Sequence, residues 1–563
     1  MNEMEHARSG LRFLVLALAT GLLLASAPGS SVGQGKKPSG TSKIAADLAA
    51  KTSNTTVDVI VRFRPGKASH AAIHSHGGSV KDDLPVVDGV LASLPGKAIE
   101  GLANDPNVIF LSPDREVKST MDYSIPTIGA NIARSNGYDG SGIGVAVIDS
   151  GVSTTPDLSS RIAYSESFIS LSADEKYGHG THVAGIIAGT GKDSAQKYVG
   201  VAPGAKIINL RVLDDNGSGT DSNVIKAIDR AISLKNQYNI RVMNLSVGRP
   251  VFETYALDPL CQAVERAWKA GIVVVTAAGN EGRNNSLGTQ GYGTIAAPGN
   301  DPYVITVGAM KTEGTVSRGD DLIASYSSKG PTLFDHIVKP DIVAPGNRIV
   351  SVSTIGVSLL ESAHTSDMVG SAYFRLSGTS MAAPMVSGAA ALLLQKNPSL
   401  TPDQVKARLM KTASKSFPTA STAVDPSTGA TYTSQYDIFT VGAGYVDIPA
   451  ALANTDTTSA TAISPKVVND PATSKVQLVT DSAAVWGDSA VWGTTAVWGS
   501  SVFLNGSSAV WGDAAVWGDS AVWGDQATQG FTAVWGDSAV WGDSAVWGDS
   551  TSGSMNATVW GED

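Results

Sequence analysis

Between residues 124 and 455, short apolar runs alternate with longer segments in which apolar residues recur every three or four positions. The short runs are continuously apolar, which is typical of strands buried on both faces, and the longer segments are typical of helices packed on a sheet. The expected strands are residues 142–148, 206–213, 242–247, 272–276 and 304–310. The expected helices begin near residue 179 and cover 222–234, 257–269, 380–395 and 402–413. This order predicts an α/β fold of three layers, with a mostly parallel sheet between helices.

A smaller unit precedes this region. Residues 57–63, 86–94 and 108–112 read as strands and residues 68–76 and 97–103 as short helices, which gives a β-α-β-α-β order within 56–120. One interpretation is a free-standing ferredoxin-like domain. Residues 28–55, rich in Ser, Gly and Lys, are expected to be a flexible lead-in.

The first 27 residues have the pattern of a secretory signal. Arg8 and Arg12 flank the start of an apolar core over 13–25, and Ala25-Ser26-Ala27 is a small-residue cleavage site. The competing interpretation is a retained membrane anchor, but the core is shorter than the roughly 20 residues that span a bilayer. We therefore expect a secreted or cell-surface protein without a transmembrane segment in its mature form.

The end of the chain is repetitive. After a Thr-, Ala- and Ser-rich linker over 456–480, residues 481–563 repeat a hexad close to Ala-Val-Trp-Gly-Asp-Ser. An even period places the Trp residues within each uninterrupted run of hexads on one side of an extended chain. The repeat is either a stacked β array or a flexible tail that orders on binding, and its partner would be a surface or a polymer.

Composition narrows the class of protein. The chain has 563 residues, of which 42% are hydrophobic and 16% charged, and its net charge is −10. After Lys475 there is no Lys or Arg, so the acidic charge belongs to the tail and no basic block suggests nucleic-acid binding. Cys261 is the single cysteine and falls in a helical pattern, so it is expected in the core, and no disulfide stabilises the chain.

Three polar residues stand where hydrolytic chemistry needs them. Asp149 leaves an apolar strand, His179 begins a helix, and Ser380 begins a long apolar helix where unpaired N–H groups and the helix dipole favour a developing negative charge. An isolated Ser there is usually a helix cap. Together, however, a hydroxyl, a base and a carboxylate that orients the base form the set required for acyl transfer. Their order, Asp-His-Ser, differs from that of α/β-hydrolases.

The segments around these residues carry a family resemblance over about residues 55–455. The stretches VIDSGV, HGTHVAGI, GVAPGAKI, NLSVG, AAGNEG, KPDIVAPG and SGTSMAAPMVSG occur in this order. The chain resembles the subtilisin-like serine proteases (subtilases). The resemblance implies a subtilisin-like fold over 121–455, with Ser380 as nucleophile, His179 as general base and Asp149 as its partner. It also implies that 56–120 is an inhibitory propeptide and folding chaperone, cut off between Val117 and Tyr123.

The resemblance extends to residues around the triad. Asn280 matches the side-chain oxyanion donor, and two segments match the edges that pair with an extended substrate: Gly217, Ser218 and Gly219, and Ser246, Val247 and Gly248. Ala296 aligns near the floor of the S1 pocket, where a small residue permits medium to large apolar side chains.

Two further residues have competing interpretations. His182 lies three positions after His179 and is expected to be a packed structural histidine rather than a catalytic one. Asp157 matches a calcium-ligand position in relatives, yet the loop over 189–199 lacks their asparagine pattern, so Asp157 is either a calcium ligand or a turn residue. No cofactor is expected for the chemistry, and structural calcium remains open.

Two functions are therefore compared. The first is a secreted endopeptidase, acting on proteins or peptides and made as an autoprocessed preproenzyme. The second is a catalytically silent surface or binding protein whose repeat tail carries the function. The intact set Asp149, His179, Asn280 and Ser380 favours the first.

Overall fold

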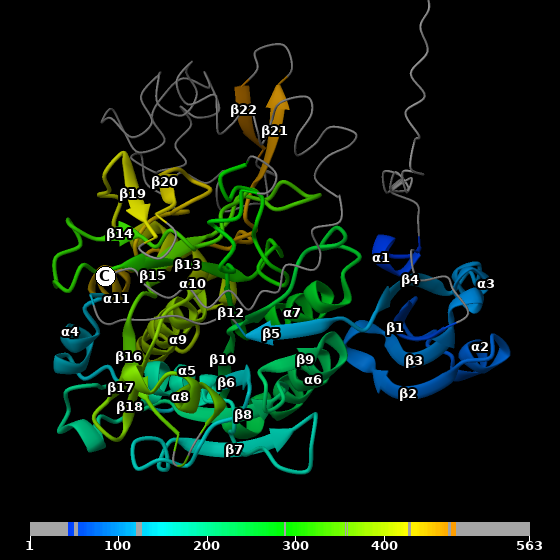
Figure 1. Cartoon of the computed structure of the whole chain (residues 1–563), viewed down its shortest axis with the longest axis horizontal. Coiled ribbons are helices and arrows are strands. Elements are labelled where there is room, and N and C mark those ends of the chain that lie inside the picture. The colour runs from blue at the N-terminus through cyan, green and yellow to red at the C-terminus, as the bar shows by residue number, and fades with distance from the viewer. Residues whose placement is uncertain are drawn as a thin grey trace, which may run out of the picture. The chain divides into compact units, whose positions relative to one another are not determined.

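The computed structural model describes residues 43–49, 55–119, 127–285, 289–354, 356, 358–425, 429–470 and 475–479 (Figure 1). The predicted signal (1–27), most of the cleavage region and the hexad-repeat tail (481–563) lie outside these residues.

An eight-stranded sheet forms the centre of the fold, in the order β14-β13-β12-β10-β6-β8-β7, with β15 also paired to β13. All pairs are parallel except β13–β14. The strands are β6 (Gly144–Asp149), β7 (Ile162–Ser167), β8 (Lys206–Arg211), β10 (Ile240–Leu245), β12 (Val273–Ala277), β13 (Ile305–Lys311), β14 (Leu322–Ile323) and β15 (Ile342–Pro345). Every residue of β6 and β12 is buried, as expected for strands covered on both faces.

Helices cover both faces of this sheet, and the subtilisin-like α/β architecture is confirmed. α5 (His179–Ala188) and α9 (Thr379–Lys396) contact each other on one face, whereas α6 (Asp221–Tyr238) and α7 (Pro259–Lys269) contact each other on the other (Figure 1). α9 is buried from its first residue through Leu394. The shorter helices are α4 (Ala130–Ser135), α10 (Pro402–Thr412) and α11 (Ile448–Ala453). Both α10 and α11 contact α9, and α4 contacts α11. Cys261 on α7 is fully buried.

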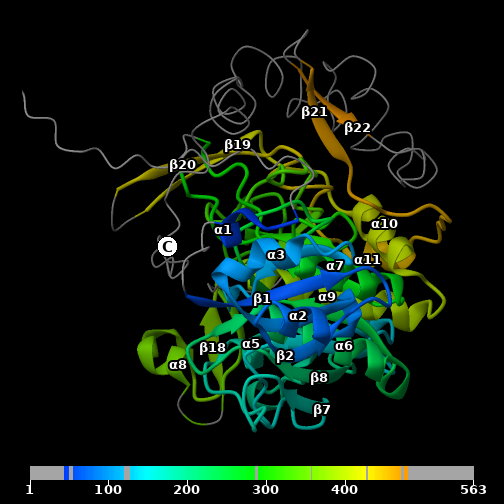
Figure 2. The ribbon, with the colours of Figure 1, turned by 90° about the vertical axis from the view of Figure 1, so that its right-hand side faces the viewer.

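The amino-terminal unit is a four-stranded antiparallel sheet of order β2-β3-β1-β4 with two helices (Figure 2). Its elements are β1 (Thr56–Phe63), α2 (His70–Ser75), β2 (Ser79–Leu84), β3 (Gly89–Pro95), α3 (Ile99–Ala103) and β4 (Val108–Pro113). The order β-α-β-β-α-β is ferredoxin-like. Sequence analysis missed β2 because its residues, SVKDDL, are mostly polar and alternate between exposed and partly buried, as in an edge strand.

The two faces of this small sheet belong to different cores. Val59, Val61 and Phe63 of β1 pack with the small unit's own helices, while Ile60 joins the core of the large domain. The turn η1 (Pro85–Val87) contacts both α6 and α7. The small unit therefore buries apolar surface against the large one.

Two segments expected to be irregular are partly ordered. Within the expected lead-in, Lys43 and Ala45 exchange backbone hydrogen bonds with Leu111 of β4, and α1 (Ala46–Ala49) follows. Within the expected linker, Ser464 N–H donates to the Pro302 carbonyl, and β21 (Lys466–Asp470) pairs with β22 (Lys475–Val479). Long-range backbone pairing of this kind leaves no periodic signal in the sequence.

The remaining strands form small peripheral sheets. They are β5 (Glu116–Ser119), β9 (Ser218–Thr220), β11 (Val247–Gly248), β16 (Ile349–Val352), β17 (Met368–Val369), β18 (Tyr373–Leu376), β19 (Ala420–Val424) and β20 (Thr431–Gln435). The short helix α8 (Leu359–Ala363) lies between β16 and β17 in the sequence. Among the described residues, no helix combines the length and apolarity needed to cross a membrane.

Candidate active site

Asp149, His179 and Ser380 lie where the carboxyl ends of the parallel strands meet helix starts. Asp149 is the last residue of β6, His179 the first of α5, and Ser380 the second of α9. The Nδ1 atom of His179 lies 2.7 Å from Oδ1 of Asp149, and both side chains are almost completely buried. With Nδ1–H donated to the carboxylate, Nε2 carries the free lone pair, and among the described residues it has no hydrogen-bond partner.

Close approach of α5 to the loop after β6 depends on Gly180. A Cβ atom at this position would lie 2.1 Å from the carbonyl oxygen of Gly151 and 3.1 Å from the Cβ of Asp149. Any side chain here would push the helix start away from the carboxylate. The glycine that follows His179 thus sets the Asp149–His179 distance.

Asp149 is held by a second buried carboxylate that sequence analysis missed. Oδ1 of Asp149 accepts from the N–H of Ser150 at 2.7 Å, while the Ser150 hydroxyl donates to Oε2 of Glu175 at 2.8 Å and accepts from Gly180 N–H at 2.9 Å. Burial raises the pKa of Glu175, and the charge of Asp149 raises it further, against hydrogen bonds that lower it. Its position four residues before His179 in the same loop was the available sequence signal.

Ser380 and Ser246 interlock the nucleophile's helix with the end of β10. The Oγ–H of Ser380 donates to the carbonyl of Ser246 at 3.2 Å, and the Oγ–H of Ser246 donates to the carbonyl of Ser380 at 2.8 Å. These reciprocal bonds fix the start of α9 beside the central strand.

The amide of Asn280 is oriented by the residue before Ser380. Its Oδ1 accepts from both the N–H and the hydroxyl of Thr379, at 3.0 and 2.9 Å. Because the oxygen is the acceptor in both bonds, the NH₂ group is left to donate elsewhere. The residue predicted as an oxyanion donor thus lies next to the predicted nucleophile.

The two predicted substrate edges are brought together by a strand of the amino-terminal unit. β5 lies between β9 and β11, antiparallel to both. Val117 pairs with Gly219, and Lys118 pairs with Ser218 on one side and Gly248 on the other. Gly217 precedes β9, and Val247 and Gly248 form β11. The edges therefore hold an extended chain by main-chain pairing.

Ala296 lies beside both β11 and the Asn280 loop. A Cβ on Gly248 would approach the Cβ of Ala296 to 3.1 Å, and one on Gly279 would approach it to 3.2 Å. The N–H of Ala296 donates to the Ala278 carbonyl at 2.9 Å. Ala296 is therefore packed between β11 and the loop that carries Asn280.

His182 is a packed histidine in a carbonyl environment. Its Nε2 lies 2.9 Å from the Ile349 carbonyl and 3.1 Å from the Phe374 carbonyl, so the neutral ring carries its proton on Nε2. Burial, together with the nearby His179, lowers the pKa of His182 to about 3. His182 is thus neutral over the ordinary pH range.

The surroundings of Asp157 do not fit a calcium ion. Its Oδ2 accepts from the Tyr373 hydroxyl, and its Oδ1 accepts from Thr190 Oγ1 and from the N–H groups of Lys192 and Asp193. Calcium requires six to eight oxygen ligands, whereas hydrogen-bond donors surround this carboxylate. Among the described residues, no group of three or more His, Cys, Asp or Glu is placed to hold a metal.

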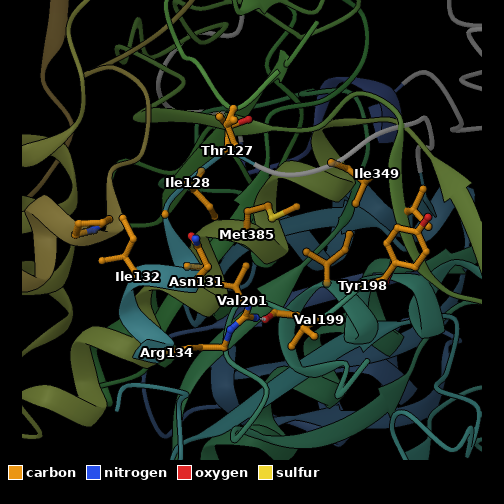
Figure 3. A pocket seen from close by; sticks show the side chains of 18 of the residues that line it. Thr127, Ile128, Asn131, Ile132, Arg134, Tyr198, Val199, Val201, Ile349 and Met385 are labelled. Carbon is orange, nitrogen blue, oxygen red and sulfur yellow. Dashed lines mark hydrogen bonds between the residues drawn. The ribbon is translucent and has the colours of Figure 1, made fainter. Parts of the chain in front are cut away.

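A separate hollow of about 790 Å³ opens beside residues 197–200, in the loop that follows α5 (Figure 3). It is lined by Thr127, Ile128, Arg134, Tyr198 and Met385, among others. None of the predicted catalytic or substrate-binding residues lines it. The hollow is therefore distinct from the site at the strand ends.

The comparisons with known proteins agree with this geometry. A sequence profile of the Subtilase family matches residues 140–436. Serine protease AprX of Bacillus subtilis (strain 168) is 42% identical over 306 residues, covering 52% of this chain and 66% of AprX. Subtilisin E of the same strain is 36% identical over 378 residues, covering 65% of this chain and 87% of subtilisin E. The chain therefore spans slightly less than two thirds of AprX but most of subtilisin E.

A solved structure is also similar. Fervidolysin from Fervidobacterium pennivorans, described as a keratinolytic enzyme related to subtilisin, matches with a TM-score of 0.55 at 25% identity, over 74% of this chain and 63% of that chain. The chain belongs to the subtilase family, whose members are serine endopeptidases.

Because His182 is buried in its neutral form, we expect the folded chain to lose stability at acidic pH. Its pKa is about 3 in the folded chain, against an ordinary histidine value of 6.5 once the chain unfolds. Its stabilising contribution is therefore complete above pH 6.5 and is lost as pH falls toward 3, with a slope of at most about 1.4 kcal/mol per pH unit. His182→Gln, in a Ser380→Ala chain that cannot digest itself, should show a shallower loss of unfolding free energy between about pH 6 and 4. Denaturant melts measure it, with His74→Gln at an exposed site as control; an unchanged slope would contradict the assignment.

The donor shell of Asp157 predicts stability without calcium. Tyr373→Phe removes one donor from a fully buried carboxylate and should lower the unfolding free energy by about 1–3 kcal/mol. Excess EGTA should leave the melting temperature of the parent chain unchanged. A chelator-induced drop that disappears in Asp157→Asn would show that Asp157 binds calcium after all.

Proposed function

We propose that this chain is a secreted serine endopeptidase that cleaves peptide bonds through an acyl-enzyme. The observation that carries the proposal is the buried 2.7 Å contact between Asp149 Oδ1 and His179 Nδ1, which leaves Nε2 available as a base, with Ser380 at the start of α9. A nucleophile, a base and a carboxylate that fixes the base's tautomer are the groups that acyl transfer requires.

The proposed reaction assigns one role to each of these residues. Ser380 Oγ attacks the peptide carbonyl carbon while its proton moves to Nε2 of His179, and the charge of Asp149 stabilises the imidazolium. The NH₂ group of Asn280 and the N–H of Ser380 at the helix start stabilise the oxyanion. Collapse expels the amine, which takes the proton from His179. Water then repeats the sequence and releases the acid.

Substrate binding is proposed to use the two edge strands. A peptide occupying the place of β5 would pair with Ser218 and Gly219 on one side and Val247 and Gly248 on the other. Main-chain pairing supplies affinity without demanding a sequence. The small side chain of Ala296 supports a preference for medium to large apolar residues next to the scissile bond.

The amino-terminal unit is proposed to be an inhibitory propeptide and chaperone. Its strand β5 occupies the substrate groove, and Asp114 accepts from the N–H and the hydroxyl of Ser222, at 2.8 and 2.6 Å, at the start of α6. A carboxylate there satisfies free N–H groups and complements the helix dipole. Self-cleavage between Val117 and Tyr123 would release the unit and open the groove.

Replacing the nucleophile tests the proposal. Ser380→Ala should abolish casein hydrolysis, because it removes the attacking oxygen, and the neighbouring hydroxyl of Thr379 is bonded to the amide oxygen of Asn280. The variant should also keep residues 56–120. Electrophoresis and amino-terminal sequencing of protein purified without other proteases measure both results. Removal of the amino-terminal unit in this variant would contradict autoprocessing.

The oxyanion role predicts a rate effect without loss of fold. Asn280→Ala should lower kcat by about 10²–10³-fold while KM changes little. Steady-state kinetics on an apolar peptide substrate measure the effect, and the far-ultraviolet spectrum checks the fold. A loss smaller than about threefold would exclude Asn280 as an oxyanion donor.

A further inference from the structure

The residue before β5 makes a contact that the proposed triad does not explain. Arg115 donates from Nη1 and Nη2 to the two carboxylate oxygens of Glu253, each at 2.5 Å. Its guanidinium carbon lies 5.0 Å from the centre of the Phe252 ring. Its Nε and Nη2 also donate to Asp47, at 3.1 and 3.0 Å. The guanidinium is therefore held by two carboxylates and one aromatic face.

We propose that Glu253 and Phe252 form a guanidinium-binding subsite beyond the end of the substrate groove, filled by Arg115 before maturation and by an arginine of the substrate afterwards. This inference rests on the proposed function, because it treats β5 as a stand-in for substrate. The ligand it assigns is an arginine side chain at one fixed distance upstream of the scissile bond.

The charges behind Glu253 show why a cation is needed there. The charge of Arg249 acts on Glu253, but Arg249 already donates to Asp221 through Nε and to Asp258 through Nη2. Within the large domain, the carboxylates of Asp221, Asp258 and Glu253 thus share the single positive charge of Arg249. Among the described residues, hydrogen bonds to the Glu253 carboxylate come from Arg115, and burial raises the pKa of Glu253 to about 7. Departure of Arg115 with the amino-terminal unit would leave this carboxylate without the cation that it binds in the precursor.

Backbone continuity shows that a substrate would reach the same place. The carbonyl of Arg115 accepts from the N–H of Asp221 at 2.7 Å, directly after the Glu116–Thr220 pair of β5 and β9. In β5, Lys118 pairs with Gly248, and Arg115 lies three residues before it. In a peptide that pairs with the edges in the same way, the side chain three residues before the one paired with Gly248 would therefore lie near Glu253.

The geometry favours arginine over lysine. Two parallel N–H donors match the two oxygens of Glu253, and a planar cation stacks on Phe252, neither of which an ammonium can reproduce. Asp47 belongs to the amino-terminal unit and would leave with it. Arginine in a substrate should therefore be held less tightly than Arg115 is held within the precursor.

The position of the preference can be fixed before specificity is measured. Amino-terminal sequencing of the mature enzyme gives the number of residues between Arg115 and the maturation site. A mass-spectrometric cleavage profile on a peptide library should then show arginine enriched at that same distance upstream. Enrichment at another distance, or none in an active enzyme, would overturn the inference. An enzyme that cleaves no peptide at all would instead contradict the proposed function.

Matched peptides and variants complete the test. Two peptides that differ by arginine or its neutral isostere citrulline at that position should differ about tenfold or more in kcat/KM. Glu253→Gln should reduce the ratio to within about twofold, whereas Glu265→Gln, on a buried carboxylate of α7, should keep it. Phe252→Leu should lower the arginine-to-citrulline ratio of kcat/KM about two- to fivefold. If Glu253→Gln does not mature, the Phe252→Leu variant alone tests the subsite. A ratio that both variants retain would exclude the subsite.

Discussion

The hydrogen bond between Asp149 and His179 is the constraint on which the rest of the site depends. It requires a buried strand to end in a carboxylate and a helix to begin 30 residues later within contact of it. The sheet supplies the first condition, since Val145, Val147 and Ile148 of β6 are fully buried. Gly180 supplies the second by allowing the helix start to touch the loop after the strand. Ser150 and Glu175 then hold the carboxylate in place from the other side.

The sequence predicted those parts of the site that are encoded in short local stretches. Asp149, His179, Asn280 and Ser380 each stand at a strand end or helix start, where apolar runs reveal the element and a polar residue follows. Glu175 escaped notice because its partner, Ser150, lies 25 residues away. Asp157 could not be interpreted from its neighbours, since one of its donors, Tyr373, is 216 residues distant.

The same distinction applies to the fold. Five parallel strands, β6, β8, β10, β12 and β13, were predicted closely, because both of their faces demand apolar side chains. The short buried strand β15 and the half-exposed edge strand β7 were not predicted. The edge strand β2 was missed because one of its faces is exposed to solvent and carries polar residues. The regular structure of residues 43–49 was missed because it depends on backbone hydrogen bonds to Leu111. Register between β5 and the two substrate edges likewise depends on main-chain groups that every residue possesses. Contacts made by the backbone are thus the part of this structure that composition and periodicity do not encode.

The contact of Asp114 with the start of α6 has a consequence for how long the protein would survive after the proposed cleavage. Removal of the amino-terminal unit takes away that cap, the cation on Glu253 and the apolar surface around Val86 and Val87. The domain that remains would lose the stabilisation that these contacts give the precursor. Its lifetime would then be set by the height of the unfolding barrier rather than by an equilibrium. A mature molecule that unfolded once would not refold, so its working life would be determined by the unfolding rate.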